Sequence, residues 1–224
     1  THRLVLEGLF GLSDRVTSTA DLMKRDQLTQ LKIKILALKH ESCKFANYQD
    51  EMEYIVTHGK RNTFIKNLVS DLKGNTLVLF NYVEKHGEPL FDLINKSIGD
   101  TKKVFFVHGG VEASEREEIR RLAEVNDNCV IIASYGTFST GINIKNLHNI
   151  IFASPSKSRI RNLQSIGRVL RKGDNKAQAV LYDIADDFSR GSYINYTLNH
   201  LKERIKVYNE EQFNYEIIPV NIKK

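Results

Sequence analysis

The segment from Gln164 to Arg171, QSIGRVLR, spaces two arginines and a glutamine so that one helix would hold them together. An α-helix turns about 100° per residue, which places Gln164, Arg168 and Arg171 within an arc of about 60°. Two guanidinium groups one turn apart suit a polyphosphate, because each is a planar and permanently charged fork. The alternative is a solvated basic helix face, and this segment alone does not separate the two interpretations.

The apolar residues of the same segment predict which side of the helix is buried. Leu163, Ile166 and Leu170 fall within a separate arc of similar width, as in an amphipathic helix. Gly167 lies beside Arg168, where the missing side chain lets another backbone or a ligand approach closely. We therefore expect the aliphatic stripe to pack inward and the basic side to face a partner.

A regular alternation of apolar runs and helical patterns extends from residue 75 to about residue 185. Apolar runs separated by helices are typical of a parallel sheet that is covered on both faces. Ser114 and Glu117 have the spacing of a capping box and predict a helix over 115–125. A further helix carries Leu90, Leu93 and Ile94 inward. The five runs occupy residues 76–80, 103–107, 129–134, 149–154 and 177–184.

The remaining chain predicts elements at both ends of this regular part. Helices are expected at 3–10, 20–24, 48–57, 62–73 and 192–209, and a strand with one wet face at 31–37. The last helix would carry Ile194, Leu198, Leu201 and Ile205 on one stripe. The segment 213–220 would be an edge strand, because Pro219 tolerates only an edge or an end. We expect three parts: a connecting segment (1–60), the main α/β domain (61–190) and a C-terminal helix with an edge strand (191–224).

Three loops follow predicted strands and carry polar or glycine-rich content. They are Asn81-Tyr82, His108-Gly109-Gly110 and the hydroxyl-rich segment 134–144. Ligands of open α/β sheets bind at the carboxyl ends of the strands, and hydroxyl and backbone N–H groups are common phosphate donors. Loop capping is the alternative for Asn81-Tyr82, and a simple turn is the alternative for His108-Gly109-Gly110.

Composition limits the class of protein. The chain has 224 residues, a net charge of +6 and a pI of about 9.2, which fits a polyanionic partner or simply basic solubility. Cys43 and Cys129 are too far apart for a disulfide framework, so we expect a reducing, cytoplasmic location. The histidines do not cluster, and we predict no metal site. No signal peptide or apolar run of membrane-spanning length occurs, so no membrane partner is expected. Because an apolar segment begins immediately after Thr1, we expect a fragment of a longer protein.

The four blocks together resemble the second RecA-like domain of superfamily 2 helicases. TLVLFN is similar to motif four, HGGVEASER to the block that follows it, ASYGTFSTGINI to motif five and QSIGRVLRKG to motif six. Order and spacing agree across residues 75–185. Motifs five and six, with the early segment LFG…TSTADLM…LTQLKI, are also similar to the recombination helicases of tailed bacteriophages.

This resemblance implies roles for residues at the matching positions. Gln164, Arg168 and Arg171 would act at the ATP γ-phosphate, with Gly167 beside them. Gly141 and Asn143 would approach the nucleotide or couple it to DNA, although the family often has Asp where this chain has Asn143. The residues implied to contact nucleic acid are Asn81, Tyr82, His108, Arg116, Ser134 and Thr137.

The sequence contains neither a GxxxxGK[ST] phosphate loop nor a DExH-type acidic motif. In the family both lie on the first RecA-like domain, which would hold most of the ATP and Mg²⁺ and would be the partner of this chain. The resemblance therefore implies the C-terminal motor half of an ATP-dependent DNA helicase or translocase, inactive as an isolated fragment. Its substrates would be branched DNA in fork regression, junction migration, recombination and repair, in the host cytoplasm if the protein is from a bacteriophage.

Two other classes stay open. One is half of a different superfamily 2 motor, such as an RNA helicase or a restriction-type translocase. The other is a basic module that binds or anneals single strands without ATP. The paired arginines argue against the second class, because sequence-neutral DNA binding does not need Gln164, Arg168 and Arg171 on one face.

Overall fold

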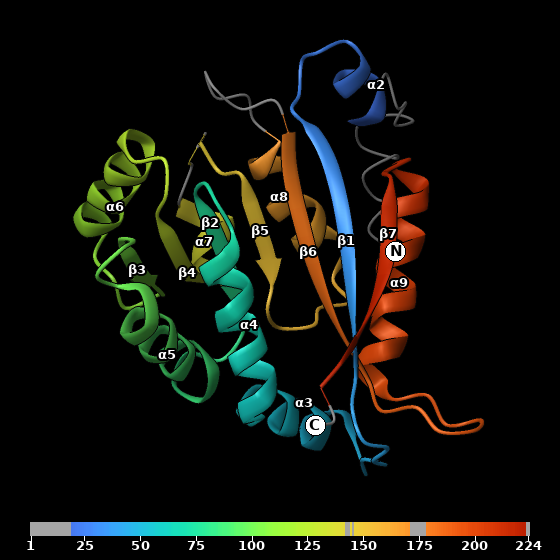
Figure 1. The fold of residues 1–224 in the computed structure, drawn as a ribbon. Coiled ribbons are helices and arrows are strands. Elements are labelled where there is room, and N and C mark those ends of the chain that lie inside the picture. The colour runs from blue at the N-terminus through green and yellow to red at the C-terminus, as the bar shows by residue number, and fades with distance from the viewer. Residues whose placement is uncertain (1–18, 142–143, 145, 171–177, 223–224) are drawn as a thin grey trace, which may run out of the picture.

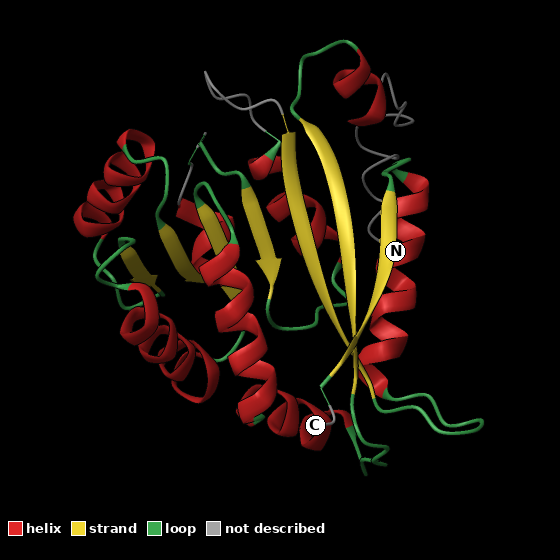
Figure 2. Ribbon diagram, in the orientation of Figure 1, coloured by secondary structure: helices red, strands yellow, loops and turns green. Residues whose placement is uncertain are grey.

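A parallel sheet of seven strands, with helices on both faces, forms the part of the chain that the computed structural model describes (Figures 1 and 2). Residues 19–141, 144, 146–170 and 178–222 are described. The strand order is β3-β4-β2-β5-β6-β1-β7, and every neighbouring pair is parallel. The predicted α/β class and all five predicted apolar strands are confirmed.

The strands are β1 (Gln30–Lys39), β2 (Thr76–Phe80), β3 (Val104–Val107), β4 (Val130–Ser134), β5 (Asn149–Phe152), β6 (Gln178–Asp187) and β7 (Tyr215–Asn221). The α-helices are α2 (Thr19–Lys24), α3 (Tyr48–Thr57), α4 (Gly59–Asp71), α5 (Glu88–Ile98), α6 (Ala113–Val125), α7 (Tyr135–Gly141), α8 (Arg159–Val169) and α9 (Tyr196–Glu210). One turn of π-helix, η1 (Val83–Gly87), precedes α5.

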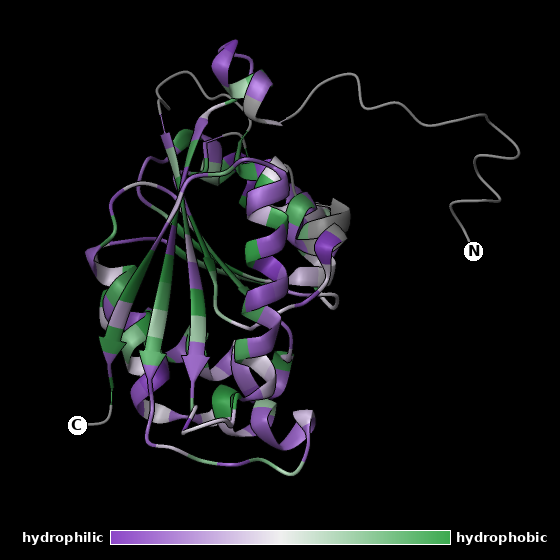
Figure 3. Cartoon of the chain, turned by 90° about the vertical axis from the view of Figure 1, so that its right-hand side faces the viewer, coloured by the Kyte–Doolittle hydropathy of each residue, from purple (hydrophilic) through white to green (hydrophobic). Residues whose placement is uncertain are grey.

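Two hydrophobic layers separate the sheet from its helices. On one face, β2, β4, β5 and β6 pack against α4 and α5. On the other face they pack against residues of α6, α7, α8 and α9. Figure 3 shows the hydrophobic strands of the sheet beside helices whose outer sides are largely hydrophilic. A strand buried on both sides must be apolar at nearly every position, which is why β2 reads TLVLF and has no exposed residue.

The predicted connecting segment supplies an interior strand of this sheet. β1 lies between β6 and β7, with Ile33 opposite Leu181 on one side and opposite Tyr215 on the other. The sheet therefore continues across the boundaries predicted at residues 60 and 190. The role of residues 1–60 as a connection to another domain stays a prediction. The expected helix at 3–10 lies outside the described residues.

The predicted edge strand is confirmed, since β7 lies at the end of the sheet and pairs only with β1 there. Pro219 stands opposite Ala37 in this pair. Proline has no N–H to donate, and an edge strand tolerates the missing donor. No helix among the described residues is long and apolar enough to cross a membrane.

Three predicted helix starts are wrong, and one is that of α4, which begins at Gly59 rather than at residue 62. Helix α6 begins at Ala113 after Glu112, so Ser114 is already inside the helix and no capping box forms. The Glu117 carboxylate instead accepts hydrogen bonds from Arg120, one turn further along. At the C-terminal end, α9 begins at Tyr196 rather than at residue 192, and Ile194 is 40% exposed before the helix.

A further correction concerns segment 134–144, which was expected to be a loop. Residues from Tyr135 to Gly141 form helix α7 instead. The Ser134 hydroxyl accepts a hydrogen bond from the N–H of Thr137 at 3.3 Å, which satisfies a donor in the first turn. The hydroxyl content that suggested a loop is thus partly a helix start.

Candidate nucleotide and nucleic-acid interface

Three of the predicted DNA-contacting positions lie on neighbouring strands at the carboxyl edge of the sheet. Phe80 pairs with Ser134 across β2 and β4, so Asn81 follows directly beside the end of β4. Val107 pairs with Ala133 across β3 and β4, which places His108 on the other side of Ser134. The strand order 3-4-2 therefore brings together residues that are 53 positions apart in the sequence (from Asn81 to Ser134).

Ser134 and Thr137 are connected to each other. The Ser134 hydroxyl donates to the Thr137 hydroxyl at 2.9 Å, and only 6% of Thr137 is exposed. Ser134 is half-buried at the end of β4. These contacts fix the start of α7, and a direct DNA contact by either residue stays a prediction.

Asn81 and Tyr82 begin the turn that leads from β2 into η1. The Asn81 N–H donates to the hydroxyl oxygen of Ser154 at 3.2 Å, which ties this turn to the residues after β5. The Tyr82 side chain is 37% exposed and lies over α3 beside Glu53 and Lys85. The bond to Ser154 involves the Asn81 backbone and not its side chain, so both loop capping and DNA contact stay predictions for this pair.

His86 lies beneath this turn, and sequence reasoning missed it. One of its ring nitrogens lies 3.0 Å from the Ser154 hydroxyl oxygen, and its side chain is fully buried. Burial, together with the nearby Arg61 charge, lowers the pKa of His86 from 6.5 to about 3. The imidazole is therefore neutral at pH 7 and acts as a packing and hydrogen-bonding group under the predicted DNA edge.

His108 and Arg116 lie at the outer end of the same edge. His108 begins a turn in which its ring accepts a hydrogen bond from the Gly110 N–H at 3.2 Å, as the alternative interpretation expected. Arg116 lies in the first turn of α6 and is half-buried. Its Nε is buried and has no hydrogen-bond partner among the described residues. A nucleic-acid role for the two residues stays a prediction.

Helix α8 buries the stripe that its sequence predicts. Ile166 is 1% exposed, Leu170 directly after the helix is fully buried, and Leu163 is partly buried against the same core. Gln164 and Gly167 are exposed. A Cβ added at Gly167 would have no other atom within 4 Å, so a nucleotide or a second domain can approach this face.

The Arg168 side chain was expected to project from the helix toward a partner, and the structure places it differently. It is half-buried, and its Nη1 donates to the Phe138 carbonyl oxygen at 2.5 Å. The guanidinium carbon also stands 5.4 Å from the centre of the Phe138 ring. Arg168 therefore connects α8 to α7, which are the elements of the two family blocks.

The predicted helix through Arg171 is too long, because α8 ends at Val169. Arg171, beyond the end of α8, lies outside the described residues, as does Asn143, and the shared face proposed for both arginines stays a prediction. Gly141 is the last residue of α7.

Two buried arginines hold the segment between β5 and α8, and the sequence analysis did not single them out. Arg61 of α4 donates to Asp186 at 2.8 Å and to the Ala153 carbonyl oxygen at 2.7 Å. Arg204 of α9 donates to Asp183 at 2.8 Å and to the Ser156 carbonyl oxygen at 3.2 Å.

Arg61 and Arg204 make the same kind of connection. Each guanidinium joins a carboxylate of β6 to a backbone carbonyl oxygen that follows β5. Burial would raise the pKa of Asp186, but the Arg61 charge and the hydrogen bonds from His40 and Arg61 lower it to about 2. The sequence did contain a sign of these buried arginines, because Asp183 and Asp186 interrupt an otherwise apolar run and buried charges need partners.

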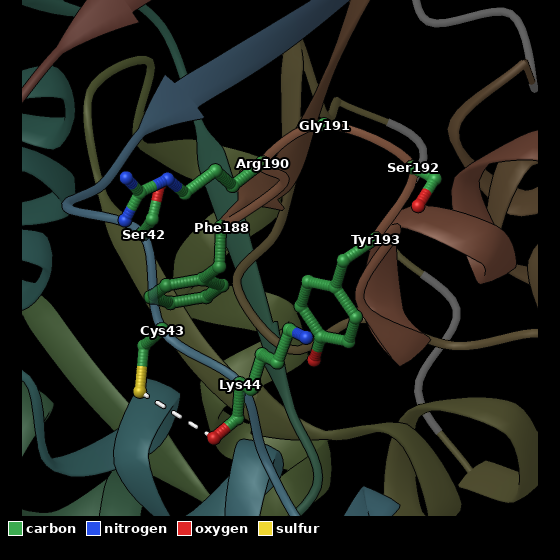
Figure 4. Close-up of a pocket in the computed structure, with 8 residues that line it drawn as sticks. All are labelled: Ser42, Cys43, Lys44, Phe188, Arg190, Gly191, Ser192 and Tyr193. Carbon is green, nitrogen blue, oxygen red and sulfur yellow. Dashed lines mark hydrogen bonds between the residues drawn. The ribbon is translucent and has the colours of Figure 1, made fainter.

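A separate hollow of about 470 Å³ lies at the carboxyl ends of β1 and β6 (Figure 4). The Lys44 ammonium stands 5.8 Å from the Tyr193 ring centre, and the Cys43 thiol donates to the Lys44 carbonyl oxygen at 3.8 Å. Phe188, at its base, stacks on His40 with ring centroids 4.0 Å apart and is 1% exposed. No group of histidine, cysteine and acidic side chains suitable for a metal ion occurs in the described part of the chain.

Fold and site together define the helicase conserved C-terminal domain, whose family model matches residues 59–173. The chain belongs to this family. It is 37% identical over 233 residues to the ATP-dependent DNA helicase uvsW of Enterobacteria phage T4, covering 96% of this chain and 46% of that protein. A putative ATP-dependent RNA helicase of Acanthamoeba polyphaga mimivirus is 25% identical over 71% of this chain and 33% of its own length.

Solved structures show the same architecture. The crystal structure of T4 UvsW matches with a TM-score of 0.74 at 36% identity, covering 87% of this chain and 42% of that one. The restriction-modification enzyme LlaBIII bound to DNA matches with a TM-score of 0.66 at 17% identity, covering 96% of this chain and 17% of that one, which shows a shared fold. The chain spans less than half the length of the two curated relatives.

Proposed function

We propose that this chain is the C-terminal motor half of an ATP-dependent DNA helicase or translocase that acts on branched DNA. The observation that carries the proposal is the Arg168 contact to Phe138. It links α8, which carries the motif-six residues implied to act on the nucleotide, to α7, which carries the motif-five residues implied to contact DNA. A nucleotide that moves Arg168 also moves α7, whose first turn adjoins the predicted DNA edge at Ser134. Packed side chains and hydrogen bonds of this kind can carry energetic coupling between two sites.

The exposed side of α8 fits one half of an ATP site. Gln164 supplies an amide, Gly167 leaves open space, and Arg168 supplies a guanidinium that can stabilise charge on the terminal phosphate. When bound, ATP supplies a phosphoryl group for transfer to water. The phosphate loop and the residues that hold Mg²⁺ belong, in this proposal, to a first RecA-like domain of the same protein. Gly141, the last residue of α7, and Asn143, which lies outside the described residues, would approach the nucleotide or couple it to DNA.

DNA would lie along the carboxyl edge formed by β3, β4 and β2. His108, Ser134 and Asn81 follow one another there, and Tyr82, Arg116 and Thr137 lie on the segments that follow β2, β3 and β4. Contacts from such short polar groups and backbone N–H groups go to phosphates, which makes the binding insensitive to sequence. Closing and opening of the two domains around ATP would move the strand along this edge.

The substrate class can be tested with the full-length protein. Its ATPase rate should rise more with a forked or four-way DNA junction than with linear duplex DNA, and more with DNA than with RNA. Equal stimulation by linear duplex would favour a restriction-type translocase, and stronger stimulation by RNA would favour an RNA helicase. Strand annealing that is independent of ATP, without DNA-stimulated hydrolysis, would contradict the motor assignment.

A further inference from the structure

A second hollow of about 370 Å³ lies beside the predicted DNA edge. One side is the segment between β5 and α8, and the other side is formed by the first turns of α3 and α9. Its lining includes Tyr48, Asn81, Lys157, Ser158, Tyr196 and His200. α3 lies below the carboxyl ends of the strands in Figure 1, and Asn81, which lines the hollow, directly follows β2 at that edge.

Three aromatic rings form one wall of the hollow. The Tyr48 and His200 ring centroids are 5.1 Å apart at an interplanar angle of 52°. Tyr196 is 38% exposed and donates its hydroxyl to the Ala46 carbonyl oxygen at 3.3 Å. Partial burial and the nearby charges of Arg204 and Lys157 lower the pKa of His200, so its ring is neutral at pH 7.

A buried carboxylate fixes this aromatic wall. Glu51, on α3 one turn after Tyr48, is fully buried and accepts hydrogen bonds from the N–H of Tyr196 at 2.7 Å and from the N–H of Thr197 at 2.8 Å. The amide of Asn195 donates to the same carboxylate at 2.7 Å. α3 and α9 are therefore joined at the point where their aromatic residues enter the hollow, and the rings are held in place before any ligand arrives.

The opposite wall is fixed by Arg204. Its guanidinium holds the Ser156 carbonyl oxygen and the Asp183 carboxylate, directly beside the exposed Lys157. Lys157 lines the hollow together with the aromatic residues, on the segment that Arg204 holds at Ser156. One cation opposite several flat rings matches a ligand that has one anionic group and one planar apolar group.

Asn81 connects the hollow to the predicted DNA edge, since it lines the hollow and also follows β2 in the row of predicted contacts. A strand that passes Ser134 and Asn81 reaches the hollow next. We propose that the hollow receives one unpaired nucleotide of a DNA strand, with the base against Tyr48, Tyr196 and His200 and its phosphate at Lys157. This inference rests on the proposed function, because it extends the path of the DNA.

The size and chemistry of the hollow support a single nucleotide. Small-molecule sites measure about 300–1,000 Å³, and the hollow falls at the small end of that range. Base stacking on aromatic side chains tolerates any sequence, because every base has a π-face. A helicase that opens duplex DNA produces unpaired bases beside the opening point, and a fixed aromatic pocket can hold one of them apart from the other strand.

The test measures binding of this chain to fluorescent single-stranded DNA of about twenty nucleotides. Tyr196→Ala should weaken binding roughly tenfold, as stacking contacts to single strands do. Tyr196→Phe should retain wild-type affinity, because it keeps the ring. Lys157→Ala should weaken binding and reduce the dependence of log affinity on log salt by about 0.7, the value for one lost phosphate contact on a single strand.

Lys202→Ala is the matched control, because Lys202 is exposed and lies about 200° around α9 from His200. It should bind as the wild type does. An oligonucleotide that consists of abasic sites alone should bind the wild type more weakly than the intact strand does. Tyr196→Ala should bind the abasic strand and the intact strand equally well. Circular dichroism checks folding, and the full affinity of Tyr196→Phe excludes general damage by substitution at this position.

Three results overturn the inference. The first is a wild-type chain that binds DNA while Tyr196→Ala and Lys157→Ala bind equally well. The second is a difference in affinity between the intact and the abasic strand that is as large for Tyr196→Ala as for the wild type. The third is saturation of the hollow by free deoxynucleoside monophosphate with no loss of strand binding, which would indicate a nucleotide site that lies off the DNA path. A wild-type chain with no affinity for DNA would overturn the proposed function as well.

Discussion

The Arg168 guanidinium donates to the Phe138 carbonyl oxygen at 2.5 Å and lies over the Phe138 ring. This contact joins two helices that follow different strands, and both helices carry residues that the family resemblance connects to activity. An arginine that serves a phosphate in one state and a carbonyl oxygen in another can report nucleotide occupancy to α7. In the proposed function, Arg168 would therefore both bind the nucleotide and transmit its presence to α7.

The isolated chain should bind DNA weakly, without sequence preference and with strong dependence on salt. The net charge is +6, and the predicted contacts are to phosphates. For about three phosphate contacts, affinity should fall by roughly 20-fold on a single strand and roughly 40-fold on a duplex between about 50 and 200 mM salt. Fluorescence anisotropy with two unrelated sequences measures this. Affinity that is flat across this range, or that differs strongly between the sequences, would rule out a phosphate-based interface.

The isolated chain should not hydrolyse ATP above background, with or without DNA. It lacks the phosphate-loop lysine and the acidic residue that hold and neutralise the β- and γ-phosphates in this class of motor. A steady-state phosphate-release assay on the purified chain provides the measurement. Robust turnover that is lost on mutation within this chain would reveal a complete site.

Stability should rise with pH between about pH 4.5 and pH 7, in part because of His86. The folded pKa is about 3, whereas an unfolded histidine has a pKa of about 6.5, so below that value the unfolded state binds more protons. His86 should contribute about 2–3 kcal/mol to the change in the free energy of unfolding over this range. Urea unfolding at both pH values should show a smaller change for His86→Gln than for the wild type. An equal change in the two proteins would show that His86 does not cause it.

Arg204→Ala should destabilise the chain by about 3–5 kcal/mol, because the substitution leaves the Asp183 carboxylate buried without its cation. Urea unfolding at pH 7 measures the difference. Lys202→Ala, an exposed change on the same helix, should lie within about 0.5 kcal/mol of the wild type. A loss below about 1 kcal/mol for Arg204→Ala would mean that water or a neighbouring group replaces the guanidinium.

The parallel core was predictable because its strands are buried on both sides and read as uninterrupted apolar runs. Leu77, Val78 and Leu79 needed no further information to be placed in a central strand. The order of the strands in the sheet was harder to predict from the sequence. Nothing local in residues 30–39 indicates that β1 lies between β6 and β7, because that position is set by packing between segments about 150 residues apart.

The candidate site was predictable where a side chain acts through its own type and spacing. Ile166 and Leu170 pack inward as the helical spacing requires, and Gln164 is exposed. The Arg168 contact to Phe138 was not predictable, since it depends on how two helices cross. The buried Arg61 and Arg204 were missed for a similar reason: their partners are aspartates of β6, which lie 125 and 21 residues away in the sequence.

The most direct test of the central claim is DNA-stimulated ATP hydrolysis by the full-length protein carrying Arg168→Ala or Arg171→Ala. Each variant should retain DNA affinity without nucleotide but lose at least about 10² in hydrolysis rate, since arginines at a transferring phosphoryl group contribute on the order of 10³–10⁵. Arg168→Lys should recover little, because a point charge does not replace a planar fork. Near-normal DNA-stimulated hydrolysis by well-folded Arg168→Ala and Arg171→Ala proteins would show that this face of the domain is a solvated basic surface and not half of an ATP site.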